Sequence, residues 1–313
     1  MEPSKVFAAS LLCLAFIFAL SAQTDLNSET GGLSAAFGQA PPPNGEYFLQ
    51  HPAGRYSDGR LVIDFVAKSL GLPYLSAYLD SVGTNFSHGA NFATAGSTIR
   101  PQNTTLTQTG YSPISLHVQL LEFDQFKSRS DYFRLRGGVF QELLPKQSYK
   151  SRPDILDKFS IVIKNVYWQG GRYFWIHNTG PVGCLSYVLH RLPVLAPQVD
   201  NAGCAIPFNQ VVQYFNQLLK ETVIRLRSDL PDYQLISEAP KYGFGNPLRA
   251  CCGHGGNYAT INWDGVHYTQ AVNQWVFEKI IGGTFSNPPT PLSQACHGHK
   301  QLEFASLLLV FLL

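Results

Sequence analysis

An aspartate and a histidine three residues apart could together perform acid–base chemistry. Asp264 and His267 lie within Ile261–Thr269, just before an amphipathic run. A carboxylate this close can hold the imidazole of His267 in one tautomer and stabilise its protonated form, as general-base catalysis requires. The same residues also fit a common Asp-Gly turn beside a packed surface histidine. The pair therefore indicates catalysis only if a nucleophile reaches it from elsewhere in the chain.

The element that must position His267 is the run that follows it. In Thr269–Ile281 the apolar side chains fall on one side of a helix, and the pair Gly282-Gly283 comes after its end. We expect His267 on a loop at the end of a sheet, where open α/β sheets bind their ligands.

The remaining periodic segments predict an α/β fold. Helical spacing is found at Arg60–Leu70 (with Ser57 or Asp58 as its N-cap), within Ser115–Gly138, and at Ile155–Tyr167 and Val211–Leu226. Short apolar stretches predict strands at Ala90–Thr94, Arg172–His177 and Tyr233–Ile236. A helix, a glycine turn and a buried strand in succession are the ingredients of a parallel sheet covered by helices.

Length and composition narrow the class of protein. The chain has 313 residues, 45% of them hydrophobic, which is enough for one large α/β domain or two small ones. Its formal net charge of +2 gives no indication of a nucleic-acid partner or of binding to an anionic membrane. No group of cysteine and histidine residues has the spacing of a zinc site, so we expect neither a metal nor another cofactor.

The pattern of residues 1–22 is typical of a secretory signal peptide. Lys5 supplies a positive charge, Val6–Leu20 is almost unbroken apolar sequence, and small residues allow cleavage after Ser21 or Ala22. A membrane anchor would need about 20 apolar residues, and this run is shorter. We therefore expect a secreted, extracellular protein.

An oxidising compartment would let the cysteines pair. Loss of the signal removes Cys13 and leaves an odd number of cysteines, namely Cys184, Cys204, Cys251, Cys252 and Cys296. This indicates a free thiol, an intermolecular bond or a missing partner. Glycosylation sequons at Asn85 and Asn103 fit the same compartment.

The last stretch of the chain, Phe304–Leu313, is almost entirely apolar. At about 1.5 Å per residue, a helix of this length spans about half of a bilayer core, so we expect no stable membrane span. A lipid-anchor signal is the alternative, although the polar spacer that should precede its apolar part is poor.

Several stretches in succession resemble one known family. They are Gly31–Ser34, Pro52–Arg60, Asn91–Ser97, His177–Cys184 and Trp263–His267. In this order they resemble the plant GDSL-type esterase/lipase family of the SGNH hydrolases. The resemblance is greatest to the branch of early-nodule-specific esterases and α-fucosidase-like proteins, and it covers nearly all of residues 27–297.

The resemblance implies a three-layer α/β/α, flavodoxin-like fold with a central, mostly parallel, five-stranded sheet. It also implies carboxylic-ester hydrolysis by a Ser–His–Asp triad. In this chain Asp264 would orient His267, His267 would be the general base, and the backbone N–H of Gly96 would stabilise the oxyanion. A single hydrolase domain would occupy residues 23–290, between the signal at 1–22 and a C-terminal tail at 291–313.

Two signature blocks of the family are absent. The nucleophile block should end just before Asn27, where the chain has Leu26 in place of the nucleophilic serine. Leucine has no hydroxyl with which to form an acyl-enzyme. A Gly-x-Asn-Asp block, whose asparagine completes the oxyanion hole, should fall between Gln147 and Asp157 but does not. A third gap, near Ala259, would account for a lost family cysteine.

Both missing blocks end strands at the centre of the family's sheet. A domain with a net stability of about 5–15 kcal/mol cannot lose two central strands unless other segments replace them. One candidate is Phe16–Ser21, which lies at the right distance before Asn27 to take the first-strand position. The hypothesis requires that this segment lie inside the sheet.

By family, the chain is therefore expected to act on carboxylic ester bonds as a secreted esterase or lipase of the apoplast or cell wall. We expect this activity to be impaired by Leu26. The partner would be a small-molecule ester or an acylated glycan. Two alternatives stay open: a non-catalytic protein that binds esters or glycans, and an incomplete product such as a mis-spliced form.

Overall fold

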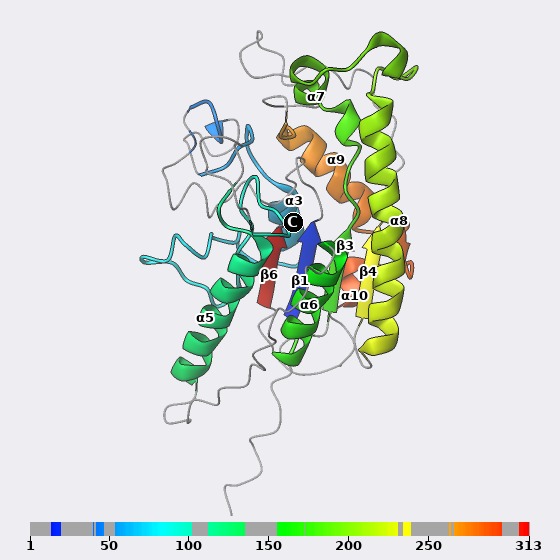
Figure 1. Cartoon of the computed structure of the whole chain (residues 1–313). Helices are drawn as coiled ribbons and strands as arrows, with labels where there is room; N and C mark the ends of the chain where they lie inside the picture. The colour runs from blue at the N-terminus through cyan, green and yellow to red at the C-terminus, as the bar shows by residue number, and fades with distance from the viewer. Residues whose placement is uncertain are drawn as a thin grey trace, which may run out of the picture.

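The structure, a computed structural model, is built around one sheet. It describes residues 14–19, 40, 42–46, 54–101, 112–134, 155–171, 173–230, 234–238, 263, 266–295 and 307–312. The strand order is β2-β6-β1-β3-β4-β5 (Figure 1). In chain order the strands are β1 (Leu14–Ala19), β2 (Gly89–Asn91), β3 (Tyr173–His177), β4 (Gln234–Glu238), β5 (Ser286–Asn287) and β6 (Leu307–Leu312).

The sheet is almost wholly parallel. Among the described strands only β5 runs antiparallel, and it pairs with β4 over two residues. The predicted α/β class is confirmed, although the sheet has six strands where the resemblance implies five. The additional strand is a short antiparallel edge, which is common in large, mostly parallel sheets.

Helices cover both sides of this sheet (Figure 1). They are α3 (Val62–Ser69), α5 (Leu116–Arg134), α6 (Ile155–Trp168), α7 (Ser186–Arg191), α8 (Ile206–Asp229), α9 (Gln270–Ile280) and α10 (Leu292–Ala295). Two short 3₁₀ helices, η1 (Val182–Cys184) and η2 (Ala196–Gln198), lie between β3 and α8. None of the helices within the described ranges is both long enough and apolar enough to cross a bilayer.

The predicted periodic segments are confirmed as helices, with ends that shift by a few residues. The largest shift is at α8, which begins at Ile206 rather than Val211. Pro207 lies in its first turn, where a proline removes no intrahelical hydrogen bond. The predicted strands are found as β2, β3 and β4, of which β2 ends at Asn91 rather than Thr94.

The predicted N-cap of α3 is wrong. The N-cap residue of α3 is Leu61, and neither Ser57 nor Asp58 caps the helix. The carboxylate of Asp64 accepts the backbone N–H of Leu61 at 2.8 Å. The Asp58 carboxylate instead accepts the N–H of Gln270, the first residue of α9, at 2.5 Å. The two residues are 212 positions apart in sequence, so local spacing could not reveal this contact.

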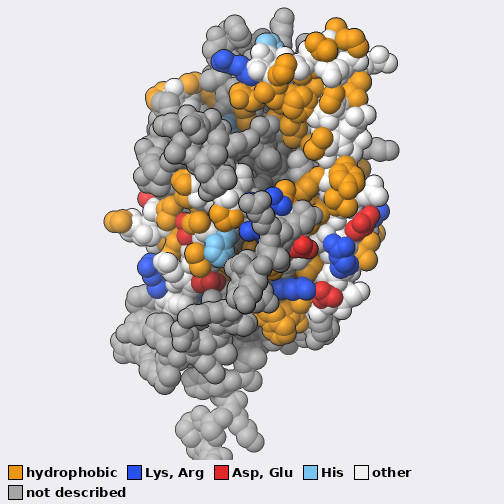
Figure 2. Space-filling model, viewed as in Figure 1, with side chains coloured by type: hydrophobic (Ala, Val, Ile, Leu, Met, Phe, Trp, Pro, Cys, Tyr) orange, Lys and Arg blue, Asp and Glu red, His pale blue; other side chains and the backbone are white. Residues whose placement is uncertain are grey.

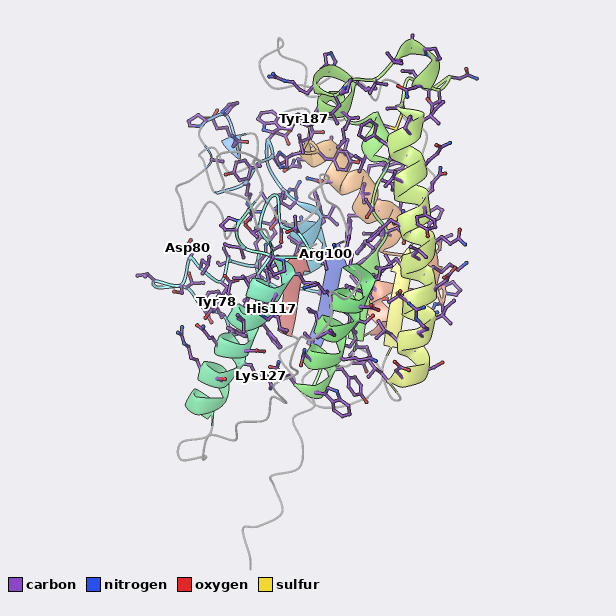
Figure 3. All side chains as sticks on the ribbon, in the orientation of Figure 1. Tyr78, Asp80, Arg100, His117, Lys127 and Tyr187 are labelled. Atoms are coloured by element: carbon purple, nitrogen blue, oxygen red, sulfur yellow. A yellow bond between two sulfur atoms is a disulfide. The ribbon has the colours of Figure 1, made fainter. Side chains whose placement is uncertain are left out.

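The side chains of β3 show how the two sides of the sheet are filled. Phe174 and Ile176 belong to a core with α5, α6 and α8, whereas Trp175 belongs to a second core with α3, α9 and α10. This alternation is what a strand buried on both faces requires. In the first core Tyr78, which lies beside α5 in Figure 3, packs edge-on against Phe126 with ring centroids 6.2 Å apart.

Two strands in the middle of the sheet come from the two apolar terminal segments. β1 pairs with β3, where Phe16 is opposite Phe174, and on its other edge with β6, where Phe16 is opposite Leu309. β6 also pairs with β2. Central parallel strands are typically unbroken apolar runs, and both segments have that composition. Of the segment Phe16–Ser21, which the sequence-based hypothesis assigned to the first strand, the structure places residues 16–19 in the sheet, between β6 and β3. Leu20 and Ser21 lie outside the described residues.

A proline in β6 tests this arrangement. Val310→Pro removes a ladder N–H between two neighbouring strands and leaves a buried carbonyl without its partner, which costs about 1–3 kcal/mol. We expect the free energy of unfolding, measured by urea titration followed by circular dichroism, to fall by at least that amount.

Val82→Pro is the matched control. Val82 is 96% exposed, and it precedes Gly83, whose φ of 76° suits the turn that Thr84 closes on Ser81. Proline is favoured at this turn position, so the variant should change the stability by less than about 0.5 kcal/mol. Equal stability of the two proline variants would contradict the place of β6 in the sheet.

Candidate active site

In Figure 1, α9 begins on the side of the sheet toward which the arrowheads of β1 and β6 point. His267 lies three residues before the first residue of α9. Its side chain is partly exposed, and its ring stacks on that of Tyr56 with centroids 5.5 Å apart and planes 24° apart. Its carbonyl accepts the N–H of Trp263 at 2.7 Å. Asp264, its predicted partner, lies outside the described residues, so contact between the two side chains stays a prediction.

Asp58 is a buried carboxylate beside this loop. Its removal from water raises its pKa, and the N–H of Gln270 and the hydroxyl of Ser57, at 2.5 and 3.2 Å, lower it in part. The pKa of Asp58 is raised overall, because the loss of water outweighs the hydrogen bonds that stabilise the charged carboxylate. Asp58 thereby fixes the start of α9 and the backbone that carries His267.

Gly96 is the third residue of a turn that follows β2. The N–H of Ser97 closes this turn on the carbonyl of Thr94 at 3.2 Å, and the φ of 67° at Gly96 disfavours any side chain. The Gly96 carbonyl accepts the N–H of Ser112 at 2.9 Å. No described residue accepts a hydrogen bond from the Gly96 N–H, as a donor to an oxyanion requires. The oxyanion role itself stays a prediction.

The segment after β3 is held against α8 by two asparagine side chains. Asn216 donates to the carbonyl of Thr179 and accepts its N–H, each at 2.9 Å. Asn209 accepts the N–H of Gly183 at 2.8 Å. A Cβ atom at Gly183 would stand 2.3 Å from the carbonyl oxygen of Ala205, so the close approach requires glycine. The segment from Thr179 to Gly183 therefore serves to pack the chain after β3 closely against α8.

A disulfide bond joins Cys184 to Cys204, two of the five cysteines whose pairing the sequence left open. It connects the end of η1 to the residues before α8, across a sequence separation of 20. The chain-entropy account assigns about 3 kcal/mol of stabilisation to a loop of similar size. Cys251, Cys252 and Cys296 lie outside the described residues.

His177, at the end of β3, is a buried histidine that sequence reasoning noted only as part of a motif. Its ring centroid lies 4.6 Å from that of Trp175. Burial lowers the pKa of His177 from 6.5 to about 4, because the charged ring would lose its hydration. His177 is therefore neutral near pH 7 and enclosed in the fold, whereas the partly exposed His267 is accessible to a ligand.

Of the other predicted site residues, the structure describes only Asn85. Asn85, in one sequon, is exposed, and its side-chain oxygen accepts the N–H of Ser87 at 2.9 Å. Leu26 and Asn103 lie outside the described residues. In the part of the chain that the structure describes, no three histidine, cysteine or acidic side chains gather as a metal site would require.

Apolar side chains are exposed above the end of the sheet toward which β1 and β6 point, which is also where α9 begins. Figure 2 shows them gathered over α7 and the start of α8, and Figure 3 places Tyr187 on α7. Leu195, Val211 and Tyr214 are 66–69% exposed. This apolar surface lies toward the strand ends at which open α/β sheets bind their ligands.

Comparison with known proteins gives consistent matches along most of the chain. The family model of GDSL-like lipases and acylhydrolases matches residues 25–280. A GDSL esterase/lipase of Arabidopsis thaliana is 48% identical over 342 aligned positions, which cover 87% of this chain and 90% of that protein. Alpha-L-fucosidase 3 of the same plant is 46% identical, with coverage of 87% and 90%. The GDSL esterase/lipase ENOD8 of Medicago truncatula is 39% identical, with coverage of 93% and 92%.

The lowered pKa of His177 predicts a loss of stability in acid. The unfolded chain takes up this proton near pH 6.5 and the folded chain only near pH 4, so the free energy of unfolding falls as the pH drops through this window. The full contribution is at most roughly 3–4 kcal/mol. We expect His177→Gln to remove it, as measured by urea unfolding at pH 7.5 and pH 4.5.

His117→Gln, which changes a partly exposed histidine on α5, is the control for this prediction. It should change the difference in stability between the two pH values by less than His177→Gln does, because it removes no buried imidazole. If His177→Gln leaves that difference unchanged, the folded protein does not hold His177 neutral.

Proposed function

Because the chain belongs to the family of GDSL-like lipases and acylhydrolases, we propose that it has the scaffold and the base of a carboxylic-ester hydrolase but is catalytically impaired. In this proposal Asp264 orients His267, and Gly96 donates to the oxyanion. The observation that carries it is the position of His267, which stacks on Tyr56 just before α9. In the sequence motif, Leu26 occurs where the family has its nucleophilic serine. Without a hydroxyl there, hydrolysis by the remaining pair and water is slower by orders of magnitude.

The strand order supports an SGNH-type, flavodoxin-like sheet with two substituted strands. The flavodoxin-like order, numbered by the strands' sequence in that fold, is 2-1-3-4-5. Here β6, beside β2, occupies the place of that fold's strand 1, and β1, beside β3, occupies the place of its strand 3. The sequence-based hypothesis assigned the N-terminal segment to the first position, so this assignment changes. The match at 87% of the 313 residues uses about 272 of them, so about 70 of the 342 aligned positions have no counterpart here. That number fits the absence of whole blocks.

Secretion is part of the proposal. The Cys184–Cys204 disulfide suits an oxidising compartment, and the exposed Asn85 is accessible to glycosylation. Cleavage after Ser21 or Ala22 would however remove β1, so the same residues cannot both leave with a signal and remain in the sheet. The intact mass of the secreted protein distinguishes the two fates.

A small-molecule ester or an acylated glycan is the ligand that fits this family. The apolar surface over α7 and the start of α8 supports an apolar acyl part. The filled positions of β1 and β6 favour a folded protein over an unfolded incomplete product. Ester or glycan binding without turnover is therefore the second candidate.

Restoring the nucleophile tests the proposal. We expect the unmodified protein and Leu26→Ala to hydrolyse p-nitrophenyl acetate and butyrate at equally low rates. Leu26→Ser should raise the rate by at least about 100-fold, well inside the roughly million-fold effect of losing a triad serine. Adding His267→Ala to Leu26→Ser should remove the gain, because the serine then lacks its base.

Circular dichroism of each variant separates loss of activity from loss of folding. Activity in the unmodified protein that His267→Ala abolishes would mean that another residue is the nucleophile. A folded Leu26→Ser variant without activity would contradict the assigned nucleophile position and leave the binding role.

A further inference from the structure

The segment before α3 runs beside the start of α9 and contacts it at several points. The hydroxyl of Ser57 lies between two acceptors, the carbonyl of Tyr268 at 3.1 Å and the carboxylate of Asp58 at 3.2 Å, which share its one hydrogen. Asp58 accepts the N–H of Gln270 at 2.5 Å. Arg60 donates to the side-chain oxygen of Gln270 from its backbone N–H and from its Nε, at 2.8 and 3.1 Å. The backbone that carries the candidate base is therefore held from one side by three residues of one short segment.

Tyr56, within this segment, contacts the side chain of His267 itself. The two rings are 5.5 Å apart and their planes differ by 24°, which is a stacked arrangement. Arg55 and Ser57 are buried, so the backbone on either side of Tyr56 is fixed, while the Tyr56 ring is partly exposed. Stacking engages the face of the imidazole and not its edge, where the two nitrogens lie. The contact thus restricts rotation of the ring without occupying its proton-transfer atoms.

We propose that Tyr56 is a positioning residue that sets the orientation of the His267 imidazole. The inference rests on the proposed function, in which His267 is the general base. A general base must lie within hydrogen-bond reach of the proton it takes, so the fraction of time its ring is correctly oriented enters the rate directly. Tyr56 acts through His267 and touches no reacting atom.

Two simpler roles for Tyr56 make different predictions. A tyrosine that only fills space would change the stability of the fold and leave the histidine ring where it is. A tyrosine that contacts substrate would change KM. Orientation of the base changes kcat, and it depends on the aromatic ring and not on the phenol hydroxyl. Tyr56→Phe should therefore behave as the unmodified protein, and Tyr56→Leu should not.

The first measurement uses the chain as it exists and needs no activity. The ring protons of His267, one of nine histidines, are assigned in the NMR spectrum by their loss in His267→Ala. A ring stacked on the imidazole shields these protons, so Tyr56→Leu should move their signals downfield, and Tyr56→Phe should leave them in place. Tyr214→Leu, which removes a tyrosine that is 66% exposed on α8, is the control and should not move them.

The second measurement is made in the Leu26→Ser background with p-nitrophenyl butyrate. Tyr56→Leu should lower kcat by about 10- to 100-fold, the range that a misplacement of about 1 Å can produce, and leave KM within about twofold. Tyr56→Phe should restore kcat. The melting temperature of Tyr56→Leu should match that of Tyr214→Leu.

Unchanged His267 signals in Tyr56→Leu would overturn the inference, as would a change confined to KM. Loss of kcat in both Tyr56→Leu and Tyr56→Phe would overturn it as well, because the ring would then not be sufficient. Failure of Leu26→Ser to gain activity contradicts the proposed function instead, and the NMR comparison then tests by itself whether Tyr56 stacks on His267.

Discussion

The shortest of the hydrogen bonds that connect the start of α9 to the segment before α3 is the one that the N–H of Gln270 donates to the buried carboxylate of Asp58. The first N–H groups of a helix have no partner within it and form the positive end of its dipole, so a carboxylate there is stabilised. Burial opposes this and raises the pKa of Asp58. A buried ion pair between Arg55 and Asp64 fixes the same segment to α3. The position of His267 thus depends on two buried contacts of the segment before α3: the Asp58 carboxylate with Gln270, and the ion pair of Arg55 with Asp64.

The sheet supplies the frame on which these loops are mounted. Buried backbone N–H and C=O groups must find partners, so β2 and β3 cannot face an empty space in the middle of the sheet. β6 and β1 fill that space and let α5, α6 and α8 pack on one face and α3 and α9 on the other. The loop after β2, with Gly96, and the end of β3, with His177, consequently lie on the same side of the sheet as the start of α9.

Periodicity explains which parts of this fold could be predicted. Segments such as α6 and α9 place apolar residues at intervals of three or four, and only a helix buries such a pattern on one side. An unbroken apolar run has the same composition in a signal peptide, an anchor or a central strand, so β6 was not predicted and β1 was only a hypothesis. His267 and Gly96 belong to local motifs, whereas the contacts of Tyr56 and Asp58 join segments more than two hundred residues apart. Only folded geometry reveals such contacts.

The uniform composition of β1 and β6 has a consequence for how the sheet is encoded. In a strand with one buried face, a slip of one residue moves its apolar side chains from the buried face to the solvent face. The free-energy cost of that exposure fixes the register. Both central strands here are apolar at every position, so a slip would exchange one apolar face for another. Their places must then be set by the lengths of the connecting segments and by the neighbouring strands. The centre of this sheet is therefore degenerate: many apolar sequences could occupy it, and the information that specifies the fold lies around it.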